Sequence, residues 1–208
     1  MSRVGCYIDG FNLYHAIAAL GRPELKWLNL SALAKSFLEK NDTLATVAYF
    51  TAVMRWNPEK ARRHREYLAA LRAAGVEIVE SKFQKTNKFC RQYQRWCDFN
   101  EEKQTDVAFA VRVISDAFSE RVDRVLLLTA DSDQIPLVRQ IRDNLPLVSV
   151  EVLAPPGRRS QARELCAAAT KFVEISAGRL GTCKFPRNVA DEAGRVVAKC
   201  PALYMAAA

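Results

Sequence analysis

Residues 3–14, RVGCYIDGFNLY, contain the junction that decides the fold. The mostly apolar run 3–8 is typical of a buried β-strand, and it stops at Asp9 and Gly10, a pair that favours a turn. Apolar residues then recur at helical spacing over residues 11–20, which predicts a helix directly after the strand. The segment therefore predicts a buried strand, a turn and a helix, with a carboxylate at the junction.

The same alternation of strands and helices continues along the chain. Apolar and β-branched runs predict further strands at residues 44–53, 76–79, 125–129, 147–153 and 172–175. Helical spacing and capping residues predict helices that start near residue 31 and that span residues 58–75, 101–118, 134–142 and 161–169. Strands that alternate with helices form a parallel sheet with helices on both faces. We therefore predict a doubly wound α/β fold in a single domain over residues 1–175.

Three parts of the chain depart from this regular pattern. Residues 81–99 have no clear periodicity and predict a long loop. Residues 101–118 predict an amphipathic helix whose apolar stripe consists of Val107, Ala110, Val111, Ile114 and Phe118. Residues 176–208 have a periodicity too weak to predict their order, so they are expected to be an extension outside the domain.

The composition is that of a globular protein with an excess of positive charge. Of the 208 residues, 50% are hydrophobic and 26% are charged, and the formal net charge is +8. Such a charge favours a polyanionic partner, either nucleic acid or an acidic membrane surface. The first ten residues contain no signal-peptide core, and the longest aliphatic run, residues 125–128, is too short to cross a bilayer. We expect a soluble, cytoplasmic protein with no membrane partner, with its six scattered cysteines reduced, which could form a homo-oligomer.

Acidic side chains follow two of the predicted strands. Asp9 follows the first strand, and Asp131 and Asp133 follow the fourth. Open parallel sheets bind ligands at the carboxyl ends of their strands, so these three carboxylates converge if the two strands are neighbours. Glu102 and Asp106 lie four residues apart and would share one face of the predicted helix, where Asp106 borders the apolar stripe. The pattern predicts a cluster of carboxylates at one edge of the sheet.

Helix capping is the alternative interpretation of several of these residues. Asp9 and Asp133 each precede a predicted helix and could serve only as caps, and Glu102 would complement the helix dipole in a first turn. Asp106 is harder to explain in this way because it lies inside the predicted helix beside apolar residues. Asp131 is also harder to explain because Asp133 is better placed to cap the helix that follows.

A cluster of carboxylates favours a bound cation. Carboxylates held close together repel one another, and some would take up protons unless a cation were present. Mg²⁺ or Mn²⁺ suits a site of oxygen ligands, here Asp9, Asp106, Asp131 and Asp133, and such sites serve phosphoryl transfer. The ion would neutralise charge on the phosphate and help to ionise an attacking water, while Asn12 would orient a carboxylate or that water.

Three segments of the chain match the signature blocks of one family. They are residues 8–14 (IDGFNLY), 101–107 (EEKQTDV) and 129–136 (TADSDQIP). In order and spacing they resemble the NYN domain, a family of the PIN-like nuclease superfamily, and in particular its LabA-like bacterial branch. The resemblance covers most of the chain, residues 1–175, and the residues around Phe185 and Lys199 are similar to the tail of that branch.

The resemblance implies a Rossmann-like sheet and metal-dependent ribonuclease activity. Within it, Asp9, Asp106 and Asp131 would form the acidic core, and Asp133 and Asn12 would support them.

The chain departs from the family at one point. Thr129 and Ala130 stand where a Ser-Gly pair is usual before the Asp-Ser-Asp sequence. Alanine adds a methyl group that restricts the turn, but threonine keeps the hydroxyl. Thr129 and Ser132 are therefore additional candidate site residues.

The stretch 82–96 combines cations with aromatic rings and has no acidic residue. Its candidate nucleic-acid-binding residues are Lys82, Lys85, Lys88, Arg91, Tyr93, Arg95 and Trp96. Cations that bind phosphates and rings that stack on bases are what single-stranded nucleic acid requires. A second basic group at residues 62–65 lies on a predicted helix, where an exposed, solvated face is the simpler interpretation.

These observations predict a metal-dependent ribonuclease that acts on single-stranded or structured RNA and leaves a 5′-phosphate and a 3′-hydroxyl. One alternative is an RNA-binding or regulatory NYN module that does not cut. Another is a metal-dependent phosphatase of small phosphate esters, although such a substrate needs no extended cationic track. No dinucleotide cofactor is expected, because no G-x-G-x-x-G motif follows the first strand.

Overall fold

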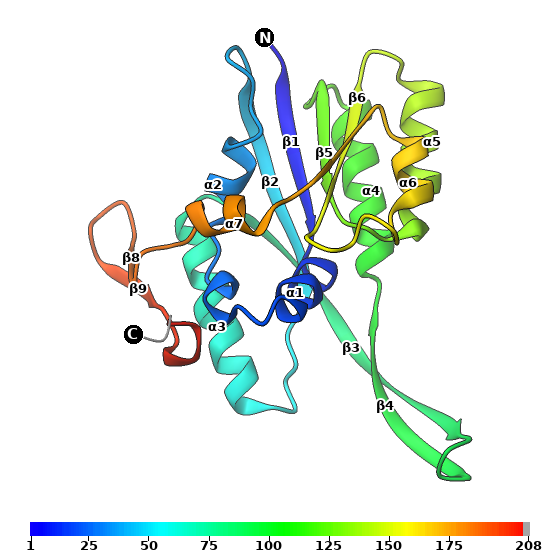
Figure 1. The fold of residues 1–208 in the computed structure, drawn as a ribbon, viewed down its shortest axis with the longest axis vertical. Coiled ribbons are helices and arrows are strands. Elements are labelled where there is room, and N and C mark those ends of the chain that lie inside the picture. Colours follow the sequence, from blue (N-terminus) through cyan, green and yellow to red (C-terminus); the bar gives the residue numbers. More distant parts are fainter. Residues whose placement is uncertain (206–208) are drawn as a thin grey trace.

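The computed structural model describes residues 1–205, and its centre is a seven-stranded sheet in the order β4-β3-β2-β1-β5-β6-β7 (Figure 1). The strands are β1 (Arg3–Asp9), β2 (Thr43–Ala52), β3 (Glu77–Cys90), β4 (Arg95–Lys103), β5 (Arg124–Leu128), β6 (Ser149–Ala154) and β7 (Lys171–Glu174). Neighbouring strands pair in parallel except β3 and β4, which form an antiparallel hairpin. The strand order reverses between β1 and β5, which makes their carboxyl ends the switch point where such sheets bind ligands.

Helices cover both faces of the sheet (Figure 1). They are α1 (Gly10–Ala19), α2 (Leu30–Lys35), α3 (Pro58–Ala73), α4 (Thr105–Phe118), α5 (Ile135–Asn144), α6 (Arg163–Ala168) and α7 (Ala177–Thr182), with 3-10 turns at Pro23–Lys26, Ser132–Gln134 and Ala202–Tyr204. Within residues 1–205, no helix is both long and apolar enough to cross a membrane.

Two hydrophobic cores lie on opposite sides of the sheet. The first packs α1, α2 and α3 against the sheet, and the second packs α4, α5 and α6. Successive residues of β1 point to opposite faces, so Cys6 and Ile8 enter the first core and Tyr7 enters the second. The mostly parallel sheet between two helical layers confirms the predicted Rossmann-like, PIN-like α/β fold.

The chain after β7 packs onto the first core. Its strands β8 (Asn188–Ala190) and β9 (Val196–Lys199) form a separate two-stranded sheet that contacts α3. Phe185 and Ala198 are buried, and the Trp27 indole donates a 2.8 Å hydrogen bond to the carbonyl of Pro186. Residues 176–205 therefore add apolar side chains to the core that also holds α1 and α3.

Residues 81–99 do not form the predicted loop. β3 continues to Cys90, β4 returns from Arg95, and residues 82–90 pair with residues 95–103 in a hairpin that projects from the body of the protein (Figure 1). Most of the hairpin is solvated on both faces. Its sequence therefore lacks the alternation of apolar and polar residues by which a half-buried strand is recognised.

The apolar stripe predicted on α4 is wrong in part. This helix has apolar residues on two sides: Val107, Val111 and Phe118 of the predicted stripe are exposed, and only Ala110 and Ile114 pack against the second core. Phe109 lies in the second core instead. The buried carboxylate of Asp116 fixes this orientation, because it accepts a 3.0 Å hydrogen bond from the hydroxyl of Tyr7 in β1.

Candidate functional site

Asp9 lies at the carboxyl end of β1, where the chain passes into α1. Its Oδ1 accepts a 3.0 Å hydrogen bond from the backbone N–H of Asn12, so the carboxylate caps the helix. Gly10 permits this junction, because a Cβ atom there would lie 2.5 Å from the carbonyl oxygen of Phe50 in β2. The Asp-Gly pair therefore places a carboxylate at the switch point while α1 starts close against the sheet.

Thr129 joins the end of β5 to this junction. Its buried hydroxyl donates a 3.0 Å hydrogen bond to Oδ2 of Asp9 and accepts a 3.1 Å bond from the backbone N–H of Asp131. The backbone N–H of Ala130 donates to Oδ1 of Asn12 at 3.1 Å. These bonds hold the two strand ends together, which gives the hydroxyl at position 129 a physical role.

Asp131 itself caps the 3-10 turn that follows it. Its Oδ1 accepts a 3.0 Å hydrogen bond from the backbone N–H of Asp133. The prediction that Asp133 is the capping residue is therefore wrong. The backbone of Asp131 is extended, with φ −80° and ψ 123°, and this conformation lets its side chain reach the N–H two residues ahead. Ser132 and Asp133 are exposed.

Glu102 and Asp106 reach the same region from β4 and from the start of α4. The helix begins at Thr105, so the prediction that Glu102 lies on it is wrong. Instead, the Glu102 carboxylate accepts hydrogen bonds from the backbone N–H and the hydroxyl of Thr105. Gln104, with a positive φ of 77°, turns the chain between strand and helix. Asp106 therefore lies in the first turn of α4 rather than inside it, where the helix dipole favours a carboxylate.

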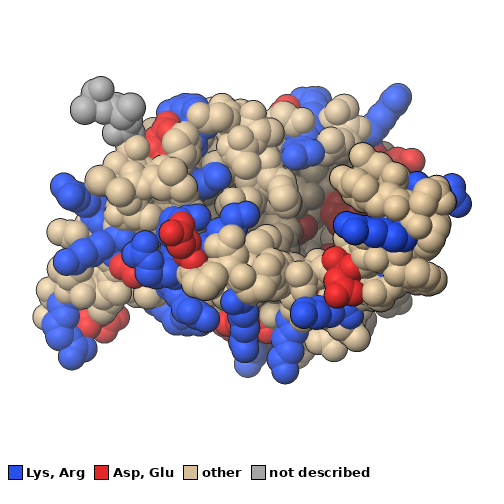
Figure 2. Space-filling view, turned by 90° about the horizontal axis from the view of Figure 1, so that it is seen from below, with Lys and Arg blue, Asp and Glu red and all other residues tan. Residues whose placement is uncertain are grey.

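These elements enclose an open cleft of about 660 Å³. Its lining consists of Asp9, Phe11, Asn12, His15, Met54, Phe83, Glu102, Thr105, Asp106, Asp131 and Arg158. It includes five predicted site residues, which are Asp9, Asn12, Glu102, Asp106 and Asp131. Thr129 is buried behind the lining, and Ser132 and Asp133 lie outside it. Figure 2, a view toward the carboxyl ends of the strands, shows acidic side chains inside a hollow and many basic ones around it.

The cationic and aromatic residues of this lining were not among the predicted site residues. Arg158 follows β6, the neighbour of β5, so the strand-end rule that located Asp9 and Asp131 would also have located it. Phe83 belongs to the hairpin, and no signal placed it near the site while its segment was expected to be a loop. His15 carried no metal-ligand spacing, and it reaches the cleft because it lies on the helix that Asp9 caps.

Burial and nearby carboxylates raise the pKa values of Asp9 and Asp106 in the cleft. Burial raises the pKa of Asp9 to about 6; two hydrogen bonds oppose this shift, and the charges of Asp106 and Asp131 add to it. The pKa of Asp106 is also raised, first by burial and then by the neighbouring carboxylates. A site in which carboxylates resist ionisation gains from a bound cation.

The donor set matches a hard divalent cation in its chemistry. Asp9, Asp106 and Asp131 offer carboxylate oxygens, which Mg²⁺ and Mn²⁺ prefer. Within residues 1–205, no three His, Cys, Asp or Glu side chains lie close enough together to form a ready-made metal site. Because uncompensated carboxylates repel one another, an ion in the cleft would have to draw these side chains toward it.

One face of the hairpin continues from the cleft. Phe83 pairs with Glu102 at the base of this face, and both residues line the cleft. Phe89 pairs with Trp96 further out, where their rings lie 6.0 Å apart. Lys85 lies between the two pairs, because alternate residues of a strand share a face. Lys85 and two aromatic rings therefore extend outward from the acidic residues, on a face that also carries Asp98 opposite Asn87.

The other predicted nucleic-acid-binding residues lie on the opposite face of the hairpin or in its turn. Lys82, Lys88 and Arg95 belong to the opposite set of alternating positions. Lys88 forms an ion pair there with Glu101. Arg91 and Tyr93 lie in the turn between the two strands.

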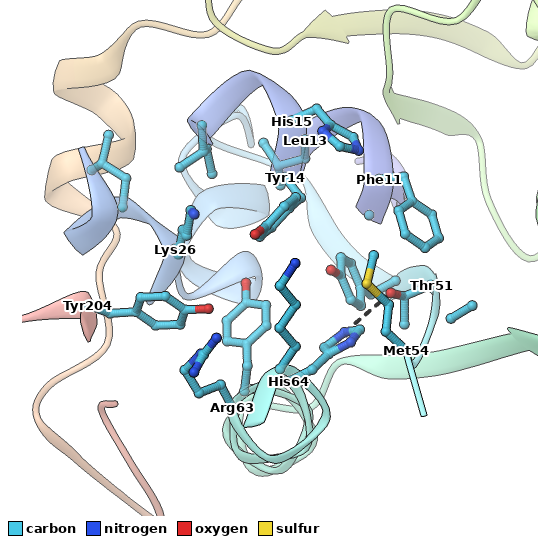
Figure 3. A pocket seen from close by; sticks show the side chains of 17 residues that line it. Phe11, Leu13, Tyr14, His15, Lys26, Thr51, Met54, Arg63, His64 and Tyr204 are labelled. Carbon is cyan, nitrogen blue, oxygen red and sulfur yellow. Dashed lines mark hydrogen bonds between the residues drawn. The ribbon is translucent and has the colours of Figure 1, made fainter. Parts of the chain in front are cut away.

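A second pocket adjoins the cleft (Figure 3). It has a volume of about 220 Å³ and lies between α1, α3 and the end of β2, with Tyr204 from the C-terminal segment on one side. Phe11, His15 and Met54 line both the pocket and the cleft, so the two cavities are neighbours. No sequence pattern indicated this pocket, because its residues come from five separate segments of the chain.

The mostly parallel sheet between two helical layers defines a PIN-like domain. The family model of the NYN domain matches residues 3–176, and the protein therefore belongs to the NYN domain family. This match confirms the resemblance that the three segments of the sequence predict.

Two further proteins are similar to this chain. The 6-hydroxy-3-succinoylpyridine 3-monooxygenase of Pseudomonas putida (strain DSM 28022 / S16) is 26% identical over an alignment of 227 residues, gaps included. The alignment covers 90% of this chain and 71% of that protein. The crystal structure of a protein of unknown function from Vibrio parahaemolyticus RIMD 2210633 has a TM-score of 0.60 and 21% identity, and the match covers 85% of this chain and 94% of that one. The second similarity supports the fold alone.

Proposed function

We propose that this protein is a metal-dependent ribonuclease and that its acidic cleft is the active site. The observation that carries the proposal is the convergence of Asp9, Asp106 and Asp131 at the switch point of the sheet, in a member of the NYN domain family. The net charge of +8 suits a polyanionic substrate, and the aromatic rings beside Lys85 on one face of the hairpin suit bases that stack.

The acidic residues would hold Mg²⁺ or Mn²⁺. Asp9, Asp106 and Asp131 are the proposed ligands, and Asp133 would add negative charge nearby. When bound, such an ion neutralises charge on the phosphate and lowers the pKa of an attacking water. Thr129 positions Asp9 through its 3.0 Å hydrogen bond, so its role is to orient a ligand.

The proposed reaction is hydrolysis of a phosphodiester. The oxygen of a water molecule forms a bond to phosphorus, and the bond between phosphorus and the 3′ oxygen breaks. The water gives up one proton and the 3′ oxygen takes up one, so the products carry a 5′-phosphate and a 3′-hydroxyl. Oδ1 of Asn12 is engaged by the backbone of Ala130, which leaves the amide nitrogen as a donor to a phosphate oxygen or to a carboxylate. The guanidinium of Arg158 can bind a phosphate oxygen in the same cleft.

Replacing a proposed ligand tests the assignment. We expect Asp131→Asn and Asp9→Asn each to reduce Mg²⁺- or Mn²⁺-dependent cleavage of an RNA oligonucleotide by at least about 100-fold, with the fold intact by circular dichroism. Asp143→Asn, at an exposed position of α5, is the matched control and should cleave like the parent. Full activity of both site variants, in preparations free of contaminating nucleases, would contradict the proposal.

The two alternatives are separable in the same assays. Tight RNA binding in the presence of a chelator, with no cleavage when metal is added, would favour an RNA-binding module that does not cut. Faster hydrolysis of nitrophenyl phosphate than of an oligonucleotide would favour a phosphatase of small esters.

A second reaction class comes from the P. putida relative, whose name describes oxygenation of a pyridine ring that carries an acidic side chain. The pocket beside the cleft favours it as a candidate, because aromatic and cationic residues line this pocket. Such a reaction consumes O₂ and a two-electron reductant. Incubation with 6-hydroxy-3-succinoylpyridine, O₂ and a reduced nicotinamide tests it, and turnover that survives Asp131→Asn would assign the protein to this class instead.

A further inference from the structure

The pocket between α1 and α3 contains none of the acidic residues that we propose for cleavage. Its volume of about 220 Å³ corresponds to roughly seven water molecules at ~30 Å³ each, which suits one ring system and is too small for a dinucleotide. Because the pocket adjoins the cleft, one part of a molecule could occupy the pocket while another part of the same molecule lies among the acidic residues.

The walls of the pocket are largely aromatic. Tyr14, Tyr49, Tyr67 and Tyr204 line it from four different segments (Figure 3). Tyr67 is held in place by a 2.8 Å hydrogen bond from its hydroxyl to the carbonyl of Leu28, and its ring packs edge-on to that of Tyr49 at 6.1 Å. Fixed aromatic rings favour a flat, aromatic ligand, because rings gain energy from stacked and edge-on contacts.

Among residues 1–205, the charged side chains that line the pocket are all cationic. Lys26, Lys60 and Arg63 line it, and no Asp or Glu does so. The Nζ atom of Lys26 lies 4.7 Å from the centre of the Tyr14 ring, so this cation remains at the pocket. The contact of Arg63 with Glu59, at 3.6 Å, is a surface pair that contributes little. A ligand with a negative charge is therefore favoured.

His64 adds a directional polar group. Its Nε2 lies 3.3 Å from the hydroxyl of buried Thr51, as Figure 3 shows. Burial lowers the pKa of His64, which favours the neutral imidazole with one donor and one acceptor nitrogen. With Nε2 engaged by Thr51, Nδ1 can bond to a heteroatom at the edge of a ring.

A ligand that is flat, aromatic and negatively charged, with a heteroatom at the edge of its ring, matches one nucleotide of a nucleic acid. We propose that this pocket binds one nucleobase of an RNA strand whose neighbouring phosphodiester lies in the acidic cleft, with the phosphate of the bound nucleotide near Lys60 and Arg63. This inference rests on the proposed ribonuclease function and adds to it a site that selects the position of cleavage by base. Phe11 and Met54 line both cavities, so they would lie between the bound base and the scissile bond.

Mononucleotide binding tests the pocket independently of cleavage. The full chain is titrated with AMP, GMP, CMP and UMP in the presence of a chelator, and binding is followed by calorimetry. We expect at least one nucleotide to bind, and Arg63→Gln to weaken it about tenfold. Arg62→Gln, an exposed position on the same helix with the same loss of charge, should bind like the parent.

Cleavage assays then connect the pocket to the cleft. With oligonucleotides that differ in one base, the parent should prefer one base and Arg63→Gln should lose that preference mainly through KM, whereas Arg62→Gln should keep it.

Nucleotide binding that depends on Arg63, in a protein that cleaves no RNA, would support the pocket while overturning the ribonuclease. Asp131-dependent cleavage with no nucleotide binding and no difference between the two arginine variants would overturn the pocket assignment alone. Binding of 4-hydroxybenzoate without any nucleotide would also overturn it, because it would show a site for small aromatic acids.

Discussion

The surroundings of Asp9 shift the pKa of its carboxyl group in opposite directions. It caps α1 and accepts the hydroxyl of Thr129, and both bonds favour the ionised form. Burial and two nearby carboxylates favour the protonated form, and burial is the largest effect, so the pKa rises from its ordinary 3.8 to about 6. Asp9 therefore binds a proton more tightly in the folded chain than in the unfolded chain. Its ionisation destabilises the metal-free fold.

We expect Asp9→Asn to increase the free energy of unfolding of the metal-free protein at pH 8. The stabilisation from protonated Asp9 is complete below the unfolded pKa near 3.8 and is lost as the pH rises through about 6. At 1.36 kcal/mol per pKa unit, the gain at pH 8 has an upper bound of about 3 kcal/mol. Urea titrations with chelator at pH 4.5 and pH 8 measure it. A gain of the same size at both pH values, or a loss at pH 8, would show that Asp9 does not titrate in this way.

The sequence predicted the chemistry of these residues better than their contacts. Strand ends predict Asp9 and Asp131 near one another because the backbone alone brings parallel strand ends together. The hydrogen bond that makes Asp131 its own cap depends on one extended backbone conformation, and a sequence pattern does not specify it. Arg158 was not predicted as a site residue, because it enters the cleft from a turn whose proline and glycine residues indicated only the end of a strand.

The hairpin is the element that the sequence described least well. Its strands carry polar residues on both faces because most of it is solvated, so period-two alternation is absent. Its pairing nevertheless sorts the cations into two sets. Lys85 lies on the face with Phe83 and Trp96, whereas Lys88 lies on the other face beside Glu101. Only the first set continues from the cleft.

This sorting predicts different effects from two matched substitutions. Lys85→Gln should weaken binding of an RNA oligonucleotide several-fold at low salt, because it removes a cation from the face that leads to the cleft. Lys88→Gln removes the same charge from the same strand, but that charge is already paired with Glu101, so its effect should be smaller. Fluorescence anisotropy in chelator, repeated at two salt concentrations, measures both. Equal losses would show that RNA does not distinguish the faces of the hairpin.

At the scale of the whole molecule, the C-terminal segment connects parts of the protein that are distant in sequence. Phe185 packs on Trp27, with ring centres 5.8 Å apart, and the backbone N–H of Lys199 donates a 2.6 Å hydrogen bond to Glu66 of α3. Tyr204 completes the wall of the nucleobase pocket proposed above. The sequence could not predict these contacts, because the elements of this segment have only three to six residues and their apolar residues form no periodic pattern. We propose that residues 176–205 unfold together with the sheet.

Phe185→Ala tests this proposal. Phe185 is 8% exposed and lies in the core beside Trp27, so its truncation should reduce the free energy of unfolding by about 3 kcal/mol. Phe118→Ala is the matched control, because that phenylalanine is 51% exposed at the end of α4 and its removal leaves no cavity. Urea unfolding should give a single transition in both variants, whether followed by tryptophan fluorescence or by circular dichroism. Equal, small losses in the two variants, or an early fluorescence transition that leaves the circular dichroism of the sheet unchanged, would show that the C-terminal segment is a separate appendage. A large loss confined to Phe185→Ala would show instead that the sheet, the pocket wall and the C-terminal segment are one cooperative unit.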